Sequence, residues 1–261
     1  GGDVRDVDLL NDAMKGVDCV VHLAAMWLHH CKDFPRTAFH VNIEGTFNVL
    51  EACVENKIKR LVYSSSASVY GDASEMPMTE NHPFNNRNFY GSTKIAGEAM
   101  CRAFYDRYGL DYVGLRYMNV YGPHQDQTAA YTGVIPIMLN KIDAKEAPVI
   151  NGNGSQAYDF IDVRDVARCN LLAMKSEATD EFYNVGTGVQ TSIRKLCDTI
   201  LELKKSDLEV TYKPYSDVDT RRMVQNRIGC TRKAKKELDF EHEIELRKGL
   251  QDLIAWREAN K

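Results

Sequence analysis

The sequence predicts an α/β protein with a doubly wound parallel sheet and a smaller C-terminal α/β lobe. Three observations favour this fold class. Short apolar runs rich in β-branched residues alternate with longer stretches of helical period, which is typical of parallel strands joined by crossover helices. The 261 residues suffice for one large domain with a small appended lobe. Polar side chains follow the apolar runs where these end, which is where open α/β sheets bind ligands.

The expected elements follow one another in a regular order along the chain. Pro35 stands at the start of a helix, where its missing N–H does no harm. The sheet domain is expected to hold strands at 17–23, 60–65 and 112–117, and helices at 35–55 and 90–107. Shorter elements are expected beyond it: a helix at 134–142, strands at 149–150 and 158–161, a helix at 163–174, a strand at 182–185, and helices at 192–204 and 247–259.

Composition and charge exclude several classes of protein. The 33 basic and 37 acidic side chains give a net charge of −4, which disfavours general binding to nucleic acid. No apolar run is long enough to span a bilayer, and no signal segment is recognisable, so we expect neither a membrane partner nor export. The seven cysteines are odd in number and include no C-x-x-C pair. We therefore expect a reducing, cytoplasmic location, no disulfide framework and no bound metal.

Tyr90 and Lys94 form the first reactive pair that the sequence indicates. Their spacing of four places the phenol and the ammonium on the same face of a helix. A nearby ammonium favours the phenolate, and we expect it to lower the pKa of Tyr90 from its usual value of about 10. Tyr90 would then accept a proton from a substrate hydroxyl near neutral pH. The alternative is an exposed helix pair without chemistry.

A serine segment precedes this pair in the chain. Ser64, Ser65 and Ser66 leave an apolar strand directly before the loop that leads to Tyr90. A serine hydroxyl and the phenol are therefore expected to converge on one substrate oxygen. The alternative is that these serines only form a turn.

In this order, the motifs resemble the extended short-chain dehydrogenase/reductase family. Within it, the chain is similar to the NAD-dependent sugar-nucleotide epimerases and dehydratases, especially those of the UDP-glucose 4-epimerase kind. The resemblance runs from Gly2 to the end of the chain. It implies a Rossmann-like NAD-binding domain over 1–123 and a mainly substrate-binding lobe over 124–261, from which some segments return to the sheet. It also implies a nucleotide-sugar substrate, expected to be UDP-linked, and a homodimer.

The resemblance implies a role for each reactive residue. Ser66, Tyr90 and Lys94 fall on the family's catalytic Ser, Tyr and Lys. Tyr90 would remove the proton from a sugar hydroxyl while hydride leaves its carbon for NAD, and Ser66 would bond the same oxygen. Lys94 would bond the nicotinamide ribose. Return of hydride to the opposite face would invert the stereocentre and regenerate NAD.

Cofactor-binding positions are carried over in the same way. Asp3 would contact the adenine, Asn42 would support the cofactor site, and Tyr117 would contact the nicotinamide. The complete set implied is Asp3, Val4, His22, Leu23, Ala24, Ala25, Asn42, Ser64, Tyr90, Lys94 and Tyr117. The family's glycine-rich pyrophosphate turn is not found, since Gly186-x-Gly188 lies too late and is expected to be a plain turn. We expect a fragment that lacks about 55 residues of β-α-β-α-β structure upstream.

The substrate-binding residues implied are Ser66, Asn119, Tyr158 and Arg222. Tyr158 stands where many relatives have an arginine that pairs with the substrate diphosphate. A phenol supplies one hydrogen bond and no charge, so a cation is expected from the basic stretch 221–236, with Arg222 preferred. The alternative for this stretch is a solvated helix start.

Two short segments allow more than one interpretation. In 27–31, two histidines and a cysteine invite a metal site, but adjacent side chains diverge, so a loop that lines the sugar pocket is favoured over metal binding. We expect His22 and His40 to be structural. On helices 35–55 and 90–107, apolar positions suit either the dimer interface or the core: Phe47, Leu50, Val54, Ile95, Ala99 and Ala103.

The residues after Ser66 favour one reaction over another. Dehydratases of this family carry Asp-Glu there, whereas this chain has Ala67 and Ser68, which cannot act as the added acid and base. Epimerisation is therefore favoured. The alternatives are a net oxidoreductase or dehydratase acting on similar substrates, and a non-catalytic, truncated relative that binds a nucleotide. The sequence does not decide between NAD and NADP.

Overall fold

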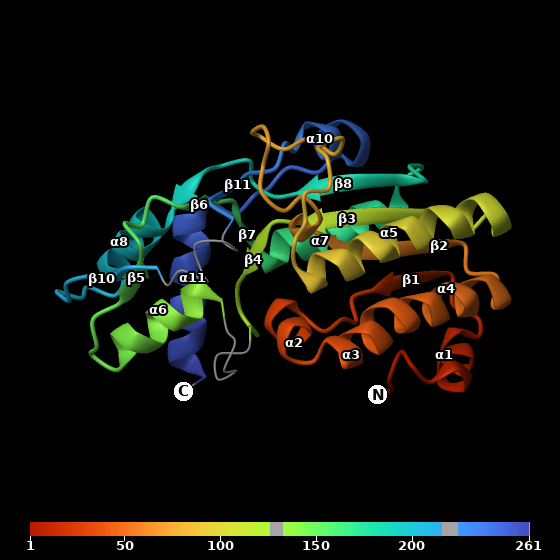
Figure 1. Ribbon diagram of the computed structural model, residues 1–261, viewed down its shortest axis with the longest axis horizontal. Helices are drawn as coiled ribbons and strands as arrows, with labels where there is room; N and C mark the ends of the chain where they lie inside the picture. Colours follow the sequence, from red (N-terminus) through yellow and green to blue (C-terminus); the bar gives the residue numbers. More distant parts are fainter. Residues whose placement is uncertain (126–132, 216–223, 261) are drawn as a thin grey trace.

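A parallel sheet forms the larger part of the molecule, and a smaller α/β part lies at one end of it (Figure 1). The computed structural model describes residues 1–125, 133–215 and 224–260. The sheet has the strand order β1-β2-β3-β8. These strands are β1 (Cys19–His22), β2 (Arg60–Ser66), β3 (Tyr112–Tyr117) and β8 (Glu181–Val185). All pairs are parallel, so the carboxyl ends of the strands share one edge.

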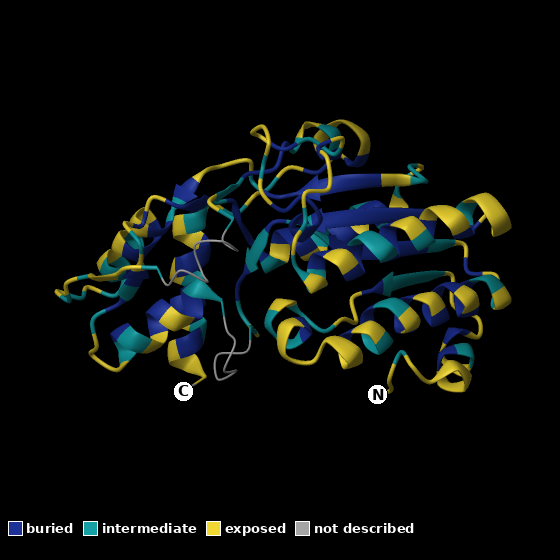
Figure 2. Cartoon of the chain, viewed as in Figure 1, coloured by how far each residue is buried: buried dark blue, intermediate teal, exposed yellow. Residues whose placement is uncertain are grey.

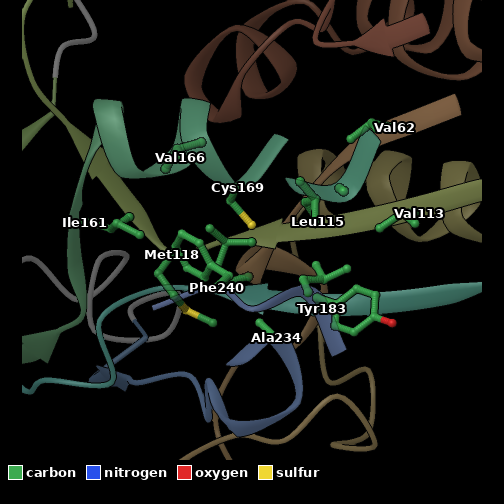
Figure 3. Packing of buried hydrophobic residues seen from close by; sticks show 14 of the residues in the cluster. Val62, Val113, Leu115, Met118, Ile161, Val166, Cys169, Tyr183, Ala234 and Phe240 are labelled. Atoms are coloured by element: carbon green, nitrogen blue, oxygen red, sulfur yellow. The ribbon is translucent and has the colours of Figure 1, made fainter. Parts of the chain in front are cut away.

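Successive side chains of a strand point to opposite faces of the sheet, so the core has a separate cluster on each face. Leu61 and Tyr63 of β2 pack in one cluster, and Val62 between them packs in another. The first cluster joins the sheet to α1 (Val7–Met14), α4 (Gly45–Glu55) and α5 (Phe89–Tyr108). The second joins it to α7 (Val163–Lys175) and α10 (Arg232–Leu238), as Figure 3 shows. Helices thus cover both faces, as a doubly wound sheet requires.

A third cluster forms the core of the smaller part, seen on the left of Figure 2. Its helices are α6 (Val134–Asp143), α8 (Ile193–Leu203) and α11 (Leu246–Ala259). Short strands surround them: β4 (Asn119–Tyr121) pairs with β7 (Phe160–Asp162), β5 (Val149–Asn151) with β10 (Thr211–Lys213), and β6 (Ala157–Tyr158) with both β9 (Thr191–Ser192) and β11 (Asn226–Arg227).

The single helix predicted over 35–55 is wrong in detail. The segment consists of α3 (Pro35–Ala38), a π-helical turn at Phe39–Glu44, and α4. Asn42 lies in the π-helical turn, and its side chain bonds the backbone of Met26 and the hydroxyl of Thr93. Such turns often occur at functional sites. The π-helical turn thus contains the residue that links this segment to Met26 and to Thr93.

The single strand predicted over 158–161 is also wrong. It breaks at Asp159 into β6 and β7, which belong to different sheets. The buried Asp159 carboxylate accepts hydrogen bonds from the backbone N–H groups of Thr187 and Gly188, at 2.8 and 2.9 Å. The 186–188 segment lies outside the helices and strands, with a bend at Gly186, and its N–H groups satisfy this carboxylate.

The segment 27–31, predicted as a loop, contains a short helix, α2 (Leu28–Asp33). A 3-10 turn at Ala67–Val69 follows β2. All seven cysteines are free. No helix among the described residues has both the length and the apolar character needed to cross a bilayer.

Candidate active site

The site is built where the first turn of α5 meets the end of β2. Asn88 caps α5 by accepting a hydrogen bond from the Gly91 N–H at 2.8 Å. A Cβ atom on Gly91 would lie 2.5 Å from the Ser68 carbonyl oxygen, so only glycine permits this close approach. The approach brings Tyr90 on α5 next to Ser66 at the end of β2. The side chains of Ser66 and Tyr90 lie close enough to share a hydrogen bond, as their expected convergence requires.

Lys94 lies one turn further along α5 and is buried. Its ammonium donates a hydrogen bond to the Ser64 carbonyl at 2.6 Å, and it lies 5.3 Å and 5.8 Å from the ring centres of Tyr63 and Tyr90. Burial lowers the pKa of Lys94 to about 8. An ammonium has three N–H donors, so Lys94 retains donor capacity for a ligand.

The pKa of Tyr90 departs from our expectation. Burial raises it to about 12, and the hydrogen-bonding Ser66 hydroxyl and the charge of Arg227 oppose this rise. The predicted lowering by Lys94 is therefore wrong for the protein alone, because desolvation of the phenol outweighs the attraction of nearby cations. Ionisation of Tyr90 near neutral pH needs further positive charge beside it.

The turn after β1 forms one wall of the site. Asn42 fixes this turn by accepting from the Met26 N–H at 2.7 Å and donating to the Met26 carbonyl at 2.8 Å. Leu23 is 62% exposed there, and Ala24 and Ala25 are exposed beside it. A fixed, exposed apolar turn at the carboxyl edge of a parallel sheet offers a surface for a flat ligand.

His22 stands at the end of β1 and is buried. Its Nε2 lies 2.9 Å from the hydroxyl of Thr46, which itself donates to the Asn42 carbonyl. Nε2 therefore carries the hydrogen and donates it. Burial and the charge of Lys94 lower the pKa of His22 to about 4, which keeps the ring neutral. These contacts agree with a structural side chain.

Asp3 and Val4 lie beside the start of α4. The Val4 carbonyl accepts from Asn48 at 3.1 Å, and Gly45 permits close approach of the Val4 side chain. Asp3 accepts hydrogen bonds from the backbone and side chain of Arg5, which lower the pKa of this exposed carboxyl to about 2. Asp3 is therefore an ionised acceptor.

Tyr117 and Asn119 mark the other side of the site. The Tyr117 hydroxyl lies 3.0 Å from Ser64 Oγ and donates to Asn170 at 2.9 Å. Asn119 donates one hydrogen bond from its side chain to the Asp159 carbonyl at 3.0 Å, which leaves its side-chain oxygen available. Tyr117 is the last residue of β3 and Asn119 the first of β4, so both lie at the strand end where they were predicted.

Tyr158 and Arg222 are the residues expected to lie near the substrate phosphates, and the structure describes only the first of them. The Tyr158 hydroxyl donates its proton to the Val224 carbonyl at 2.9 Å, so it has no proton for a phosphate in this arrangement. Arg222 lies outside the described residues. Arg227 lies in the same basic stretch, but no local pattern distinguishes it there. Its Nε is buried and has no hydrogen-bond partner in the part of the chain that the structure describes, and its charge acts on the phenol of Tyr90.

A buried ion pair behind the site was also missed. Arg116 of β3 binds Glu98 of α5 through two hydrogen bonds of 2.9 and 2.7 Å, and Ser65 donates to Glu98 at 2.6 Å. Both charged side chains are almost fully buried. The pair ties α5 to β2 and β3 directly behind Ser66 and Lys94. No group of metal-ligating side chains occurs within the described ranges.

Comparisons with known proteins show the family to which the chain belongs. The family model described as the NAD dependent epimerase/dehydratase family matches residues 1–186. The chain is 34% identical over 262 residues to a putative UDP-glucose 4-epimerase of Methanocaldococcus jannaschii, covering 99% of this chain and 83% of that protein. It is 29% identical over 267 residues to dTDP-D-glucose 4,6-dehydratase of Bos taurus, covering 99% and 73%.

A solved structure extends the likeness to the whole fold. The UDP-N-acetylglucosamine 4-epimerase of Methanobrevibacter ruminantium, in complex with UDP-N-acetylmuramic acid, matches with a TM-score of 0.94 at 31% identity. The match covers 100% of this chain and 82% of that chain. This chain belongs to the NAD dependent epimerase/dehydratase family, and its fold is Rossmann-like. The predicted family, fold class and NAD cofactor are confirmed.

The described residues fit NAD in their chemistry. The exposed apolar turn at Leu23 suits a flat ring system, and the donor capacity of buried Lys94 suits ribose hydroxyls. The ionised Asp3 carboxylate suits the amino and hydroxyl donors of an adenosine. Leu23 follows β1, and Lys94 lies against the end of β2. Asp3 lies near the start of α4. Doubly wound folds bind dinucleotides at this carboxyl side of the sheet.

Proposed function

We propose that the protein is an NAD-dependent epimerase of a nucleotide sugar, UDP-linked, which oxidises a sugar hydroxyl transiently to a ketone. Tyr90 is the proton acceptor, and Ser66 and Lys94 assist it. The observation that carries this proposal is the meeting of Ser66, Tyr90 and Lys94 at the carboxyl end of β2, beside the exposed turn after β1.

The proton transfer depends on the surroundings of Tyr90. Ser66 orients the sugar hydroxyl by a hydrogen bond to its oxygen, while the phenolate of Tyr90 takes the proton. Because burial raises the pKa of Tyr90 to about 12, ionisation requires the combined positive charge of Lys94, Arg227 and the oxidised nicotinamide. Tyr90 later returns the proton to the same oxygen.

NAD, when bound, supplies the hydride acceptor and later the hydride donor at the sugar carbon. Lys94 would hold the nicotinamide ribose, and Tyr117 would lie against the nicotinamide. Asp3 and Val4 would hold the adenosine, and His22, Leu23, Ala24, Ala25, Asn42 and Ser64 would form or support the remaining wall. Asn119 would bind the substrate diphosphate. Residues 1–123 would thus carry most cofactor contacts and 124–261 most substrate contacts.

The turn after Ser66 supports epimerisation over dehydration. Ala67 and Ser68 occupy a buried 3-10 turn, and neither side chain can serve as an acid or base for elimination of water. A net oxidoreductase or a dehydratase is the second candidate, because relatives of this chain include a dehydratase.

Product analysis tests the proposal. The purified full-length protein is incubated with NAD and a panel of nucleotide sugars, and products are separated while reduced nicotinamide is followed by absorbance. We expect one sugar to convert to its stereoisomer without accumulation of NADH. Stoichiometric NADH indicates a net oxidoreductase, and a dehydrated product indicates a dehydratase. Nucleotide-sugar binding without conversion indicates a non-catalytic relative. Each of these three results contradicts the proposal.

We also propose a homodimer formed through α4 and α5. Leu50 is buried in the core, so it does not contribute, whereas Phe47 of α4 and Ala99 and Ala103 of α5 are exposed. These three apolar side chains suit a helix-to-helix interface. Light scattering of the purified protein should give twice the mass of one chain, and a monomer would contradict this proposal.

A further inference from the structure

The buried ammonium of Lys94 and the buried carboxylate of Glu98 lie one turn apart on α5. Only 5% of Lys94 and 3% of Glu98 is exposed to solvent. Their spacing of four residues places both side chains on the same face of the helix. Lys94 donates a hydrogen bond to the Ser64 carbonyl at 2.6 Å, and the Glu98 carboxylate accepts one from the Ser65 hydroxyl at 2.6 Å. Both charges are thus anchored to consecutive residues of β2.

Arg116 holds the Glu98 carboxylate in place and in its ionised form. The guanidinium donates two hydrogen bonds to this carboxylate, at 2.9 and 2.7 Å, beside the bond from Ser65. A buried carboxylate keeps its charge when an arginine pairs with it in this way. Arg116 is fixed in turn by the Tyr70 hydroxyl and the Glu80 carbonyl, at 2.9 and 2.8 Å. Glu98 therefore supplies a negative charge at a fixed position.

Lys94 needs such a charge, because burial disfavours its ammonium form. Burial lowers the pKa of Lys94 to about 8, and three groups oppose this lowering: Cys31 of α2, and Cys101 and Glu98 of α5. Both thiols stay protonated at neutral pH, since burial raises the pKa of each above its ordinary value. Of these three groups, Glu98 is therefore the one that is charged when it acts on Lys94.

The other titratable groups that face Lys94 are neutral in the protein alone. They are His22 of β1, Tyr63 of β2 and Tyr90 of α5. Burial lowers the pKa of His22 to about 4 and raises the pKa of both phenols, so all three are uncharged at neutral pH. Oxidised nicotinamide beside Tyr90 would add positive charge and disfavour the ammonium further. Without the charge of Glu98, Lys94 would lose its proton just where its charge is needed to ionise Tyr90.

We propose that Glu98 is a positioning residue for the reaction: it fixes β2 behind Lys94 and keeps Lys94 in its ammonium form. This inference rests on the proposed function, in which that ammonium assists the ionisation of Tyr90. Glu98 acts through Lys94, from behind the site. Its ion pair with Arg116 thus has an effect besides stability, because it places a negative charge one turn from the catalytic ammonium.

Unfolding of the full-length protein without NAD tests the effect of the charge. Denaturant unfolding gives stability against pH, from about 6 to 10, for wild type, Glu98→Gln and Glu98→Asp, each with and without Lys94→Met to isolate the contribution of Lys94. Because the folded-state pKa of Lys94 is about 8, below its ordinary value of 10.5, the unfolded chain binds more protons between these values, and this contribution rises with pH there. The rise should begin about one pH unit lower in Glu98→Gln and stay in place in Glu98→Asp.

The pH profile of kcat, with NAD and the nucleotide sugar that the protein converts, gives the functional readout. On the basic limb of this profile Lys94 loses its proton. The limb should move about one pH unit lower in Glu98→Gln, so that kcat there falls by up to about tenfold, and Glu98→Asp should restore it. Glu146→Gln, which removes a carboxylate with a 63% exposed side chain, should leave both the limb and the unfolding curve unchanged.

A purely structural ion pair would give a different result. Glu98→Gln would then lose stability and kcat equally at every pH, with no movement along the pH axis, which overturns the inference and leaves the proposed function intact. If Glu98→Gln does not fold because Arg116 loses its partner, the double variant Glu98→Met, Arg116→Met removes both buried charges and should show the same shift. A wild-type protein that converts no nucleotide sugar contradicts the proposed function, while the unfolding curves still decide whether Glu98 controls Lys94.

Discussion

The two polar groups that flank Tyr90 differ in how the chain brings them together. On the sheet side, Ser66 ends one strand, and Lys94 lies one turn away on the same helix as Tyr90. On the small-lobe side, Tyr158 and Arg227 come from separate segments that meet only because β6 pairs with β11. Local spacing determines the first group, whereas the tertiary fold determines the second. A sequence therefore indicates the chemistry of such a site better than its choice of substrate.

The two sides also differ in how their charges are satisfied. Behind Ser66 and Lys94, the buried Arg116 is matched by the Glu98 carboxylate at 2.7 Å. On the small-lobe side, the buried Nε of Arg227 has no hydrogen-bond partner among the described residues. The buried cation on the first side is therefore satisfied within the chain, whereas this Nε is not.

The largest effect is expected from Tyr90→Phe, which removes the proton acceptor from the sheet side. Turnover should fall by about 10²- to 10⁴-fold, the usual contribution of general acid–base catalysis. Tyr108→Phe is the matched control, because this tyrosine lies on the same helix with 56% exposure. Initial rates of product formation measure both variants. Equal rates for Tyr90→Phe and wild type would remove Tyr90 from its role.

Glu98→Gln tests whether the scaffold behind the site depends on its ion pair. The change leaves the buried Arg116 guanidinium without a compensating charge, so the free energy of unfolding should fall by about 3–5 kcal/mol. Denaturant unfolding of the variant measures the loss. Glu146→Gln, which removes an exposed partner of Lys141, should change stability hardly at all. Similar stabilities of the two variants would contradict the scaffold role.

A smaller effect concerns His22 and acid pH. Because the folded-state pKa of His22 is lowered to about 4, below the ordinary value of 6.5, the unfolded chain binds more protons between these values. Its stabilising contribution is thus complete above pH 6.5 and is lost as the pH falls towards 4, by at most about 3 kcal/mol. His22→Asn should flatten this part of the curve of stability against pH. His40→Asn, which removes a histidine whose side chain is 43% exposed, is the control. An unchanged curve in His22→Asn would contradict the assignment.

Much of the larger domain could be predicted from sequence. The strand expected at 112–117 is β3 as observed, and the helix expected at 90–107 differs from α5 by one residue at each end. The strand is a short apolar run, and α5 is bounded by a cap at Asn88 and by the left-handed Gly109. The spacing of Tyr90 and Lys94 could be read from the same helix, whereas the catalytic roles proposed for Ser66, Tyr90 and Lys94 come from the family resemblance.

The features that the sequence did not predict depend on contacts between segments far apart in the chain. The π-helical turn at Phe39–Glu44 contains an asparagine that bonds the turn after β1 and α5, and the break at Asp159 coincides with bonds from the 186–188 turn. Neither leaves a periodic signal. The pKa of Tyr90 could not be foreseen either, because it depends on burial that only the folded chain creates.

The most direct measurement follows a deuterium label placed on the sugar carbon that bears the reacting hydroxyl. With the full-length protein, NAD and the nucleotide sugar that it converts, the account predicts that the stereoisomeric product keeps deuterium on that same carbon, since the hydrogen leaves as hydride and returns to its origin. Deuterium lost to solvent, or found on a different carbon, would contradict transient oxidation and return at the site built around Tyr90.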